Sequence, residues 1–353
     1  MLLREDGAFQ RHPSLNVIDS CGAMPLHEGV RLLVFLLSLL SAVQAAETPS
    51  VGELLSYLRI DPLKQKELFS GKILSTDVTE ASDKELAVGL VMFLPVPMGD
   101  LVSNVRGGKL FALDHDLIAY GELKENATPG EIAVSFAETE ARDLMKSEPG
   151  SHFNLSTEEI QKFRDLSNAD DPAKAAQLYQ NVLFQRYEAY RKGGLNAIEP
   201  YDRGNGKLTA PGNEIQGSLN ESKLLAAYFP ELQRALLDYP KNQAEGITHR
   251  FFWLNENVEN RPTFILAHRL SYVRPEGAFM AECQYYVGHS YDSLQILAGC
   301  LPAWNGTLIF YSNRTFTDQV AGFASGMRHS IGRDRMREDV IKGFEEFRAT
   351  VPK

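Results

Sequence analysis

Lysine and arginine are few relative to the acidic residues, and they form no long cluster. The sequence has 36 Lys and Arg against 46 Asp and Glu, which gives a formal net charge of −10. A protein of this charge is repelled by the phosphate backbone of nucleic acids, so we exclude nucleic acid as a partner. The one local concentration of arginines, between Arg328 and Arg337, is interpreted as the solvated surface of a helix.

Signatures of metal and cofactor sites are also missing. The sequence has no H-E-x-x-H, no C-x-x-C and no C-x-x-C-H motif, which are spacings that hold zinc, redox dithiols or haem. Gly206-Lys207 is not part of a phosphate-binding loop, because the earlier glycine is absent and Leu208 stands where serine or threonine would bind magnesium. We expect neither a metal ion nor a cofactor, and this favours a non-enzymatic protein.

The apolar segment near the N-terminus is too short for a membrane-spanning helix, which needs roughly 20 apolar residues. Leu32 to Val43 is 12 residues long, follows Arg31 and contains two serines. Small residues come next, with Val43 and Ala45 at positions −3 and −1 of a cleavage site, and this is the layout of a secretory signal peptide. We expect cleavage near Ala45 and a soluble periplasmic or secreted protein with no stable transmembrane anchor.

Residues 1–45 are therefore interpreted as leader and signal peptide, and residues 46–353 as the exported protein. The first 23 residues are polar and make the n-region unusually long, whereas Met24 would begin a conventional signal peptide. We interpret residues 1–23 as a mis-assigned start. The alternative is a genuine leader without regular structure.

Only three cysteines are present, and Cys21 lies in the leader. Cys283 and Cys300 are placed symmetrically about the junction of Tyr291 and Asp292. A two-residue hairpin at that junction would put the two cysteines directly opposite each other, close enough for a disulfide in an oxidising compartment. We predict this disulfide if the turn lies at Tyr291-Asp292.

Hydrophobic periodicity divides the exported chain into successive strand and helix regions. Strands are predicted at 72–78, 85–94 and 117–123, with a short amphipathic helix at 98–105. From 131 to 245 the pattern is mainly helical, and we interpret this part as an inserted lobe or lid. Its clearest helix begins at Pro172, after the capping residue Asp171, and ends at Gly193 and Gly194. Residues 195–217 lack periodicity and are predicted to form an ordered loop or a lid.

Five strands separated by short turn sequences follow the helical region. They are predicted at 250–258, 263–273, 279–289, 294–301 and 307–316, and the short separators favour an antiparallel meander. An amphipathic helix at 334–350, extending back toward Asp318, ends the chain. We predict one α+β domain over 46–353, with an antiparallel sheet, a long C-terminal helix and an inserted helical lobe.

This order of elements resembles the helix-grip architecture of the START-like lipid-binding superfamily. The resemblance covers 71–123 and 248–350 and rests on element order, not on a motif. It implies a curved sheet that wraps around the final helix, with an apolar or amphipathic small molecule held between them. The helical lobe departs from the family pattern and would form a lid. The expected function is non-enzymatic binding of such a molecule.

Four polar residues of the meander are candidates for holding the polar end of a ligand. With regular alternation, His268 shares a face with Phe264 and Leu270, and His289 follows at the same period on the next strand. Asn313 and Arg314 on the last strand complete this set. The alternative is that each histidine is a hydrogen-bonded structural residue.

Two further functions are consistent with the sequence. The segment from Gly288 to Asp292 lacks only the second glycine of a G-x-S-x-G nucleophile elbow, so a serine hydrolase or esterase would use Ser290, Asp318 and His329. Asp292 replaces the glycine that normally lets the following helix pack, and no alternating strand–helix pattern surrounds the segment, which argues against it. The other alternative is an envelope scaffold or interaction protein with an acidic surface.

Overall fold

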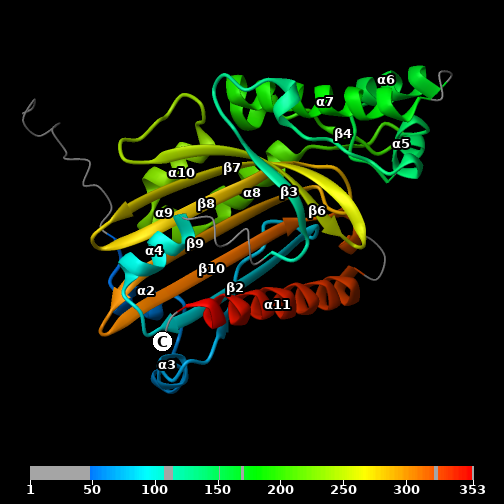
Figure 1. The fold of residues 1–353 in the computed structure, drawn as a ribbon. Coiled ribbons are helices and arrows are strands. Elements are labelled where there is room, and N and C mark those ends of the chain that lie inside the picture. The colour runs from blue at the N-terminus through cyan, green and yellow to red at the C-terminus, as the bar shows by residue number, and fades with distance from the viewer. Residues whose placement is uncertain (1–47, 107–113, 151, 168–170, 322–324, 352–353) are drawn as a thin grey trace, which may run out of the picture. The chain divides into compact units, whose positions relative to one another are not determined.

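One antiparallel sheet of eight strands organises the chain (Figure 1). The computed structural model describes residues 48–106, 114–150, 152–167, 171–321 and 325–351. The strand order is β1-β2-β10-β9-β8-β7-β6-β3, and every neighbouring pair is antiparallel. The strands are β1 (Leu74–Thr76), β2 (Glu85–Leu94), β3 (Leu117–Leu123), β6 (Thr248–Val258), β7 (Arg261–Arg274), β8 (Gly277–Val287), β9 (Ser293–Ala303) and β10 (Gly306–Phe316).

Helices from two parts of the chain bury one face of the sheet. Within the described residues, two precede it, α2 (Val51–Tyr57) and α3 (Pro62–Phe69), and six lie in the lobe between β3 and β6. Their apolar sides and the strands share one large core, which contains the tyrosines of α7 at its centre. The lobe helices are α5 (Glu138–Met145), α6 (Thr157–Ser167), α7 (Pro172–Gly193), α8 (Pro211–Glu221), α9 (Lys223–Tyr228) and α10 (Pro230–Leu237).

The other face of the sheet carries α4 (Met98–Arg106) and the long C-terminal helix α11 (Ser325–Thr350). Figure 1 shows α11 lying along β2. Phe344 and Phe347 of α11 pack against a smaller core that includes Met92 and Ile309. The predicted α+β class, with an antiparallel sheet, an inserted helical lobe and a long helix at the end of the chain, is confirmed. Within the described residues, no helix combines the length and apolar character needed to cross a bilayer.

Side-chain caps fix the starts of two lobe helices, and the one at Asp171 was predicted. The Asp171 carboxylate accepts hydrogen bonds from the backbone N–H groups of Ala173 and Lys174, with Pro172 as the first residue of α7. At α6 the Ser156 hydroxyl accepts from the backbone N–H of Glu159, whose carboxylate accepts from the backbone N–H of Ser156.

The stretch 195–217 is not simply a loop. It contains the small hairpin β4 (Tyr201–Asp202) and β5 (Leu208–Thr209), and α8 begins inside it at Pro211. Two glycines lower the helix propensity of α8, so the hydrophobic periodicity of this segment does not predict the helix. Gly212 has a packing reason, because a Cβ there would collide with the carbonyl oxygen of Leu195.

The predicted disulfide is wrong, because the β8–β9 connection is longer than a two-residue turn. Residues 288–292 join the strands, and the register pairs Cys283 with Gln295 and Cys300 with Ala278. Cys283 belongs to the core that faces the lobe, whereas Cys300 belongs to the core on the α11 side. Both cysteines are buried and free, on opposite faces of the sheet.

A buried ion pair joins α6 to α7. Arg186 donates from Nε and Nη2 to the two carboxylate oxygens of Glu159 at 2.7 and 2.6 Å, and the side chains are 5% and 9% exposed. The guanidinium also donates to the carbonyl oxygen of Glu199 and lies over the ring of Tyr286 on β8, 4.6 Å from its centroid. The pair therefore ties two lobe helices to the sheet.

Removal of the Glu159 carboxylate is expected to destabilise the fold strongly. The variant Glu159→Gln leaves Arg186 buried without its counter-charge, and breaking such a pair lowers the free energy of unfolding by about 3–5 kcal/mol. Urea unfolding followed by circular dichroism measures this change. The control is Glu158→Gln, because Glu158 is an exposed neighbour that pairs with Lys162 on the surface, and it should unfold at the wild-type midpoint. Equal midpoints for the two variants would contradict the prediction.

Candidate functional site

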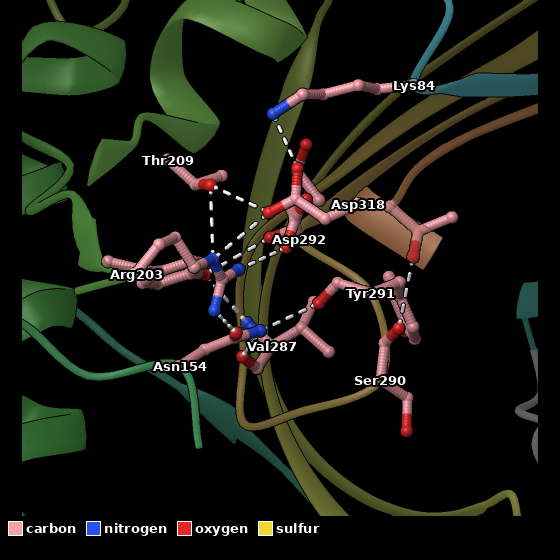
Figure 2. A network of polar contacts seen from close by, with 12 residues as sticks. Lys84, Asn154, Arg203, Thr209, Val287, Ser290, Tyr291, Asp292 and Asp318 are labelled. Atoms are coloured by element: carbon pink, nitrogen blue, oxygen red, sulfur yellow. Dashed lines mark hydrogen bonds and ion pairs between the residues drawn. The ribbon is translucent and has the colours of Figure 1, made fainter. Parts of the chain in front are cut away.

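A network of charged side chains joins the lobe to the sheet at the 288–292 turn (Figure 2). Arg203, which follows β4, is its centre. Its guanidinium forms a close ion pair with Asp292, donates to the amide oxygen of Asn154 at 2.7 Å and lies 3.2 Å from Asp318 Oδ2. Lys84, just before β2, holds the other carboxylate oxygen of Asp318 at 2.5 Å. We call these five residues the junction network.

The junction network also fixes the backbone of the turn. The amide of Asn154 donates to the carbonyl oxygens of Val287 and Tyr291 at 2.8 and 2.7 Å (Figure 2). The backbone N–H of Asn154 donates to the carbonyl oxygen of Gly288. Three polar groups of the turn are thus satisfied by one lobe residue, which explains how a buried five-residue connection is tolerated.

A third carboxylate, Glu214 of α8, lies beside the network. It accepts a hydrogen bond from the Ser293 hydroxyl at 2.7 Å. Burial, with the charge of Asp292 nearby, raises the pKa of Glu214 to about 8. Burial also raises the pKa of Asp292 to about 6, although Arg203 opposes the shift. Among the described residues, no three His, Cys, Asp or Glu side chains are grouped as metal ligands. The network is therefore a set of internal ion pairs. Asp292 and the adjacent Glu214 retain protons more readily than ordinary carboxylates. Although burial acts in the opposite direction, Lys84 and Arg203 lower the pKa of Asp318.

The predicted catalytic triad is not assembled. Asp318 is engaged by Lys84 and Arg203. His329 Nε2 lies 2.6 Å from the carbonyl oxygen of Glu85, so it must donate, and Nδ1 then accepts from an arginine of α11. Ser290 Oγ contacts Nδ1 of the adjacent His289 at 2.7 Å. Within the described residues no hydrogen bond joins Ser290 to His329, or His329 to Asp318, because each is committed to a different part of the sheet.

His289 lies beyond the end of β8 and is held by the backbone. A β-bulge at Tyr285 interrupts the alternation on which its predicted position depends. Nε2 lies 3.1 Å from the carbonyl oxygen of Pro262 and therefore donates, so Nδ1 accepts the Ser290 hydroxyl proton. Burial and the charge of Arg261 lower the pKa of His289 to about 4, so the ring is neutral at neutral pH. These partners give His289 a structural role in the turn.

His268 is also enclosed by protein groups. Its Nδ1 lies 2.9 Å from the Tyr190 hydroxyl and its Nε2 lies 3.0 Å from His249 Nδ1, while the ring of Phe251 stacks on it at 4.4 Å. Burial and the neighbouring His249 hold the pKa of His268 well below its usual range. Neither His268 nor His289 lines the two cavities described below.

Asn313 and Arg314 lie on opposite faces of β10. Asn313 contacts Tyr311 and Thr315 on the side of α11. Arg314 faces the lobe, where its Nε lies 2.6 Å from Glu85 Oε1. Burial raises the pKa of Glu85, and Arg314 opposes that shift. The four residues proposed from the sequence as ligand contacts are therefore not brought to one cavity.

An open hollow of about 550 Å³ lies at the β9–β10 turn. Its aromatic wall consists of Phe69 from α3, Phe93 from β2 and Trp304 from the turn, with Phe69 in edge-to-face contact with both other rings, at 5.3 and 4.4 Å between centroids. Trp304 is 78% exposed. Arg348 of α11 completes the rim and donates to the carbonyl oxygen of Gly71 at 2.6 Å.

Sequence reasoning missed this hollow, although one signal was present. A tryptophan in a two-residue hairpin loop has no neighbours along the chain that could bury it, and large exposed aromatic groups commonly mark binding surfaces. The other walls come from segments far apart in the sequence, and only the sheet register brings them together.

No protein-family model matches this chain, and neither does any curated protein or solved structure with which it was compared. Function is therefore inferred from the chemistry of the cavities.

Loss of the Glu214 carboxylate should change how stability depends on pH. Because the folded pKa of about 8 exceeds the ordinary value of 4.5, the contribution of Glu214 is complete below pH 4.5 and is lost as pH rises to 8. Relative to Glu214→Gln, the wild type should lose up to about 1.4 kcal/mol of unfolding free energy per pH unit in this window.

Urea unfolding at several pH values between 4.5 and 8 measures the difference. Glu221→Gln is the matched control, since Glu221 is exposed at the end of the same helix, and it should follow the wild type. If the unfolding free energies of the wild type and Glu214→Gln change in parallel with pH, the raised pKa assigned to Glu214 is refuted.

Proposed function

We propose that the protein is an exported binder of an amphipathic small molecule with an anionic head group, and that the hollow at the β9–β10 turn is its binding site. The observation that carries the proposal is the aromatic wall of Phe69, Phe93 and Trp304 beside Arg348. A volume of about 550 Å³ lies within the range of about 300–1,000 Å³ that small-molecule sites occupy.

The chemistry of the hollow favours an apolar chain or ring with one negative end. Apolar groups gain by leaving water for the exposed face of Trp304, at about 25 cal/mol for each Å² removed from water. The Arg348 side chain is 39% exposed; its Nη1 donates to the carbonyl oxygen of Gly71, and its Nη2 lies 3.8 Å from Glu345 Oε1, an ion pair beyond hydrogen-bond distance. The remaining donors of this guanidinium can bind a carboxylate, sulfonate or phosphate.

The main wall is positioned by rigid elements. Gly306, the first residue of β10, is needed there because a Cβ would collide with the carbonyl oxygen of Leu94 and with the ring of Phe93. This close approach brings the β9–β10 turn against the end of β2, so that Trp304 and Phe93 line the same hollow. A site of this kind is better suited to binding than to bond cleavage, because the described residues that line it include no nucleophile paired with a base.

Octanoate and 1-octanol provide a matched test, because they share a chain length and differ in charge. The wild type should bind octanoate more tightly. Arg348→Gln should lower the affinity for octanoate about tenfold, as expected for the loss of one charge-assisted hydrogen bond, and leave the affinity for octanol unchanged. Trp304→Ala should lower the affinity for both ligands. Isothermal titration gives the affinities, and a blue shift of tryptophan emission reports contact with Trp304, since Trp253 is already buried.

Lys342→Gln serves as the control, because Lys342 is an exposed cation on the same helix that does not line the hollow. It should bind octanoate as the wild type does. The proposal fails if the wild type binds neither ligand, or if Trp304→Ala leaves both affinities unchanged. Native mass spectrometry of gently purified protein would identify the natural ligand.

A further inference from the structure

A second cavity lies beside Arg314, between the sheet and the junction of α8 and α9. Its volume is about 90 Å³, equivalent to roughly three water molecules at about 30 Å³ each. Tyr57, Leu297 and Phe310 supply apolar walls, and Ser312 and Arg314 of β10 supply polar groups. It shares no lining residue with the hollow at the β9–β10 turn.

Arg314 is buried with unused hydrogen-bond donors. The residue is 3% exposed, and its Nε and Nη2 have no hydrogen-bond partner. The contact of 2.6 Å with Glu85 Oε1 is an ion pair without hydrogen-bond geometry, since Oε1 also lacks a hydrogen-bond partner. Buried arginines normally bond most of their donors, and Arg314 lines the cavity, so its guanidinium is placed to take an oxygen acceptor there.

The strand register gathers hydroxyl groups near this guanidinium. Thr76 of β1 and Ser312 of β10 are both paired with Gly89 of β2, so all three share one face of the sheet. Gly89 has no side chain, and a Cβ there would collide with Thr76 Oγ1. Arg314 is two residues beyond Ser312 and therefore lies on the same face. A small oxyanion in the cavity would meet the Arg314 guanidinium and two hydroxyl groups.

The rim of the cavity is mainly acidic, and its charge is therefore opposite to that of the Arg314 guanidinium. Asp77 and Glu221 line it and are exposed, and among the described lining residues Lys223 is the exposed cation. With Glu85 already paired to Arg314, the surroundings carry more negative than positive charge, which disfavours a simple anion. A ligand that places its negative end inside and a positive end at the rim matches this arrangement.

We propose that this cavity binds a small zwitterionic amino acid, with its carboxylate on Arg314 and the nearby hydroxyls and its ammonium group between Asp77 and Glu221. The volume limits the ligand to a few carbon atoms. The site is independent of the amphipathic ligand proposed for the hollow.

Calorimetric titration with glycine, β-alanine and 4-aminobutanoate tests the proposal. At least one of these should bind at least tenfold more tightly than butanoate, which lacks the ammonium group, and butylamine, which lacks the carboxylate. The proposal is overturned if none of the three amino acids binds, or if butanoate binds equally well.

Three variants locate the binding. Ser312→Val fills the cavity while leaving Arg314 and Glu85 intact, and it should reduce amino acid affinity at least tenfold. Glu221→Gln should weaken the amino acid but not butanoate. The double variant Arg314→Gln/Glu85→Gln removes the ion pair without leaving a single buried charge, and it should abolish binding.

Circular dichroism and the urea unfolding midpoint report whether each variant is folded. If the double variant fails to fold, Ser312→Val decides the question. Wild-type amino acid affinity in a folded Ser312→Val protein would overturn the assignment of the site. Loss of octanoate binding through Trp304→Ala should leave amino acid binding unchanged, so the two proposals can fail separately.

Discussion

The pairing of Arg203 with Asp292 is the interaction on which the arrangement of lobe and sheet depends. One guanidinium reaches two carboxylates and an amide from three different segments of the chain. Asn154, held by the same guanidinium, satisfies the backbone of the turn between β8 and β9. This turn sets the register of β8 and β9. The register decides which of their residues face the lobe and which face α11.

Inside this framework, several polar groups are buried in matched sets. His268 lies between a tyrosine and a second histidine, and Arg186 is bonded to Glu159 and a carbonyl oxygen. Such groups are tolerated because each donor meets an acceptor. Arg314 is the exception among the buried arginines, since its Nε and Nη2 have no hydrogen-bond partner. That contrast underlies the proposal that Arg314 binds a ligand.

Much of the fold could be predicted from the sequence because the signals were local. Strand β2 has the predicted bounds, and α7 begins and ends where Pro172 and Gly193 indicate. The disulfide and the position of His289 could not be predicted, because a bulge at Tyr285 and a five-residue connection shift the register. Alternation of residue types does not reveal either feature. The walls of the hollow come from α3, β2, a hairpin turn and α11, so only tertiary structure assembles them.

The two-residue loop at Trp304 has a thermodynamic consequence. β9 and β10 pair along their full length, from Ala303 with Gly306 to Ser293 with Phe316, so the indole is carried by an anchored backbone. A ligand that docks on it need not order a loop, and the usual loss of conformational entropy on binding is correspondingly small. Affinity at such a surface comes from contact with a preorganised ring, so even a shallow site can retain a ligand.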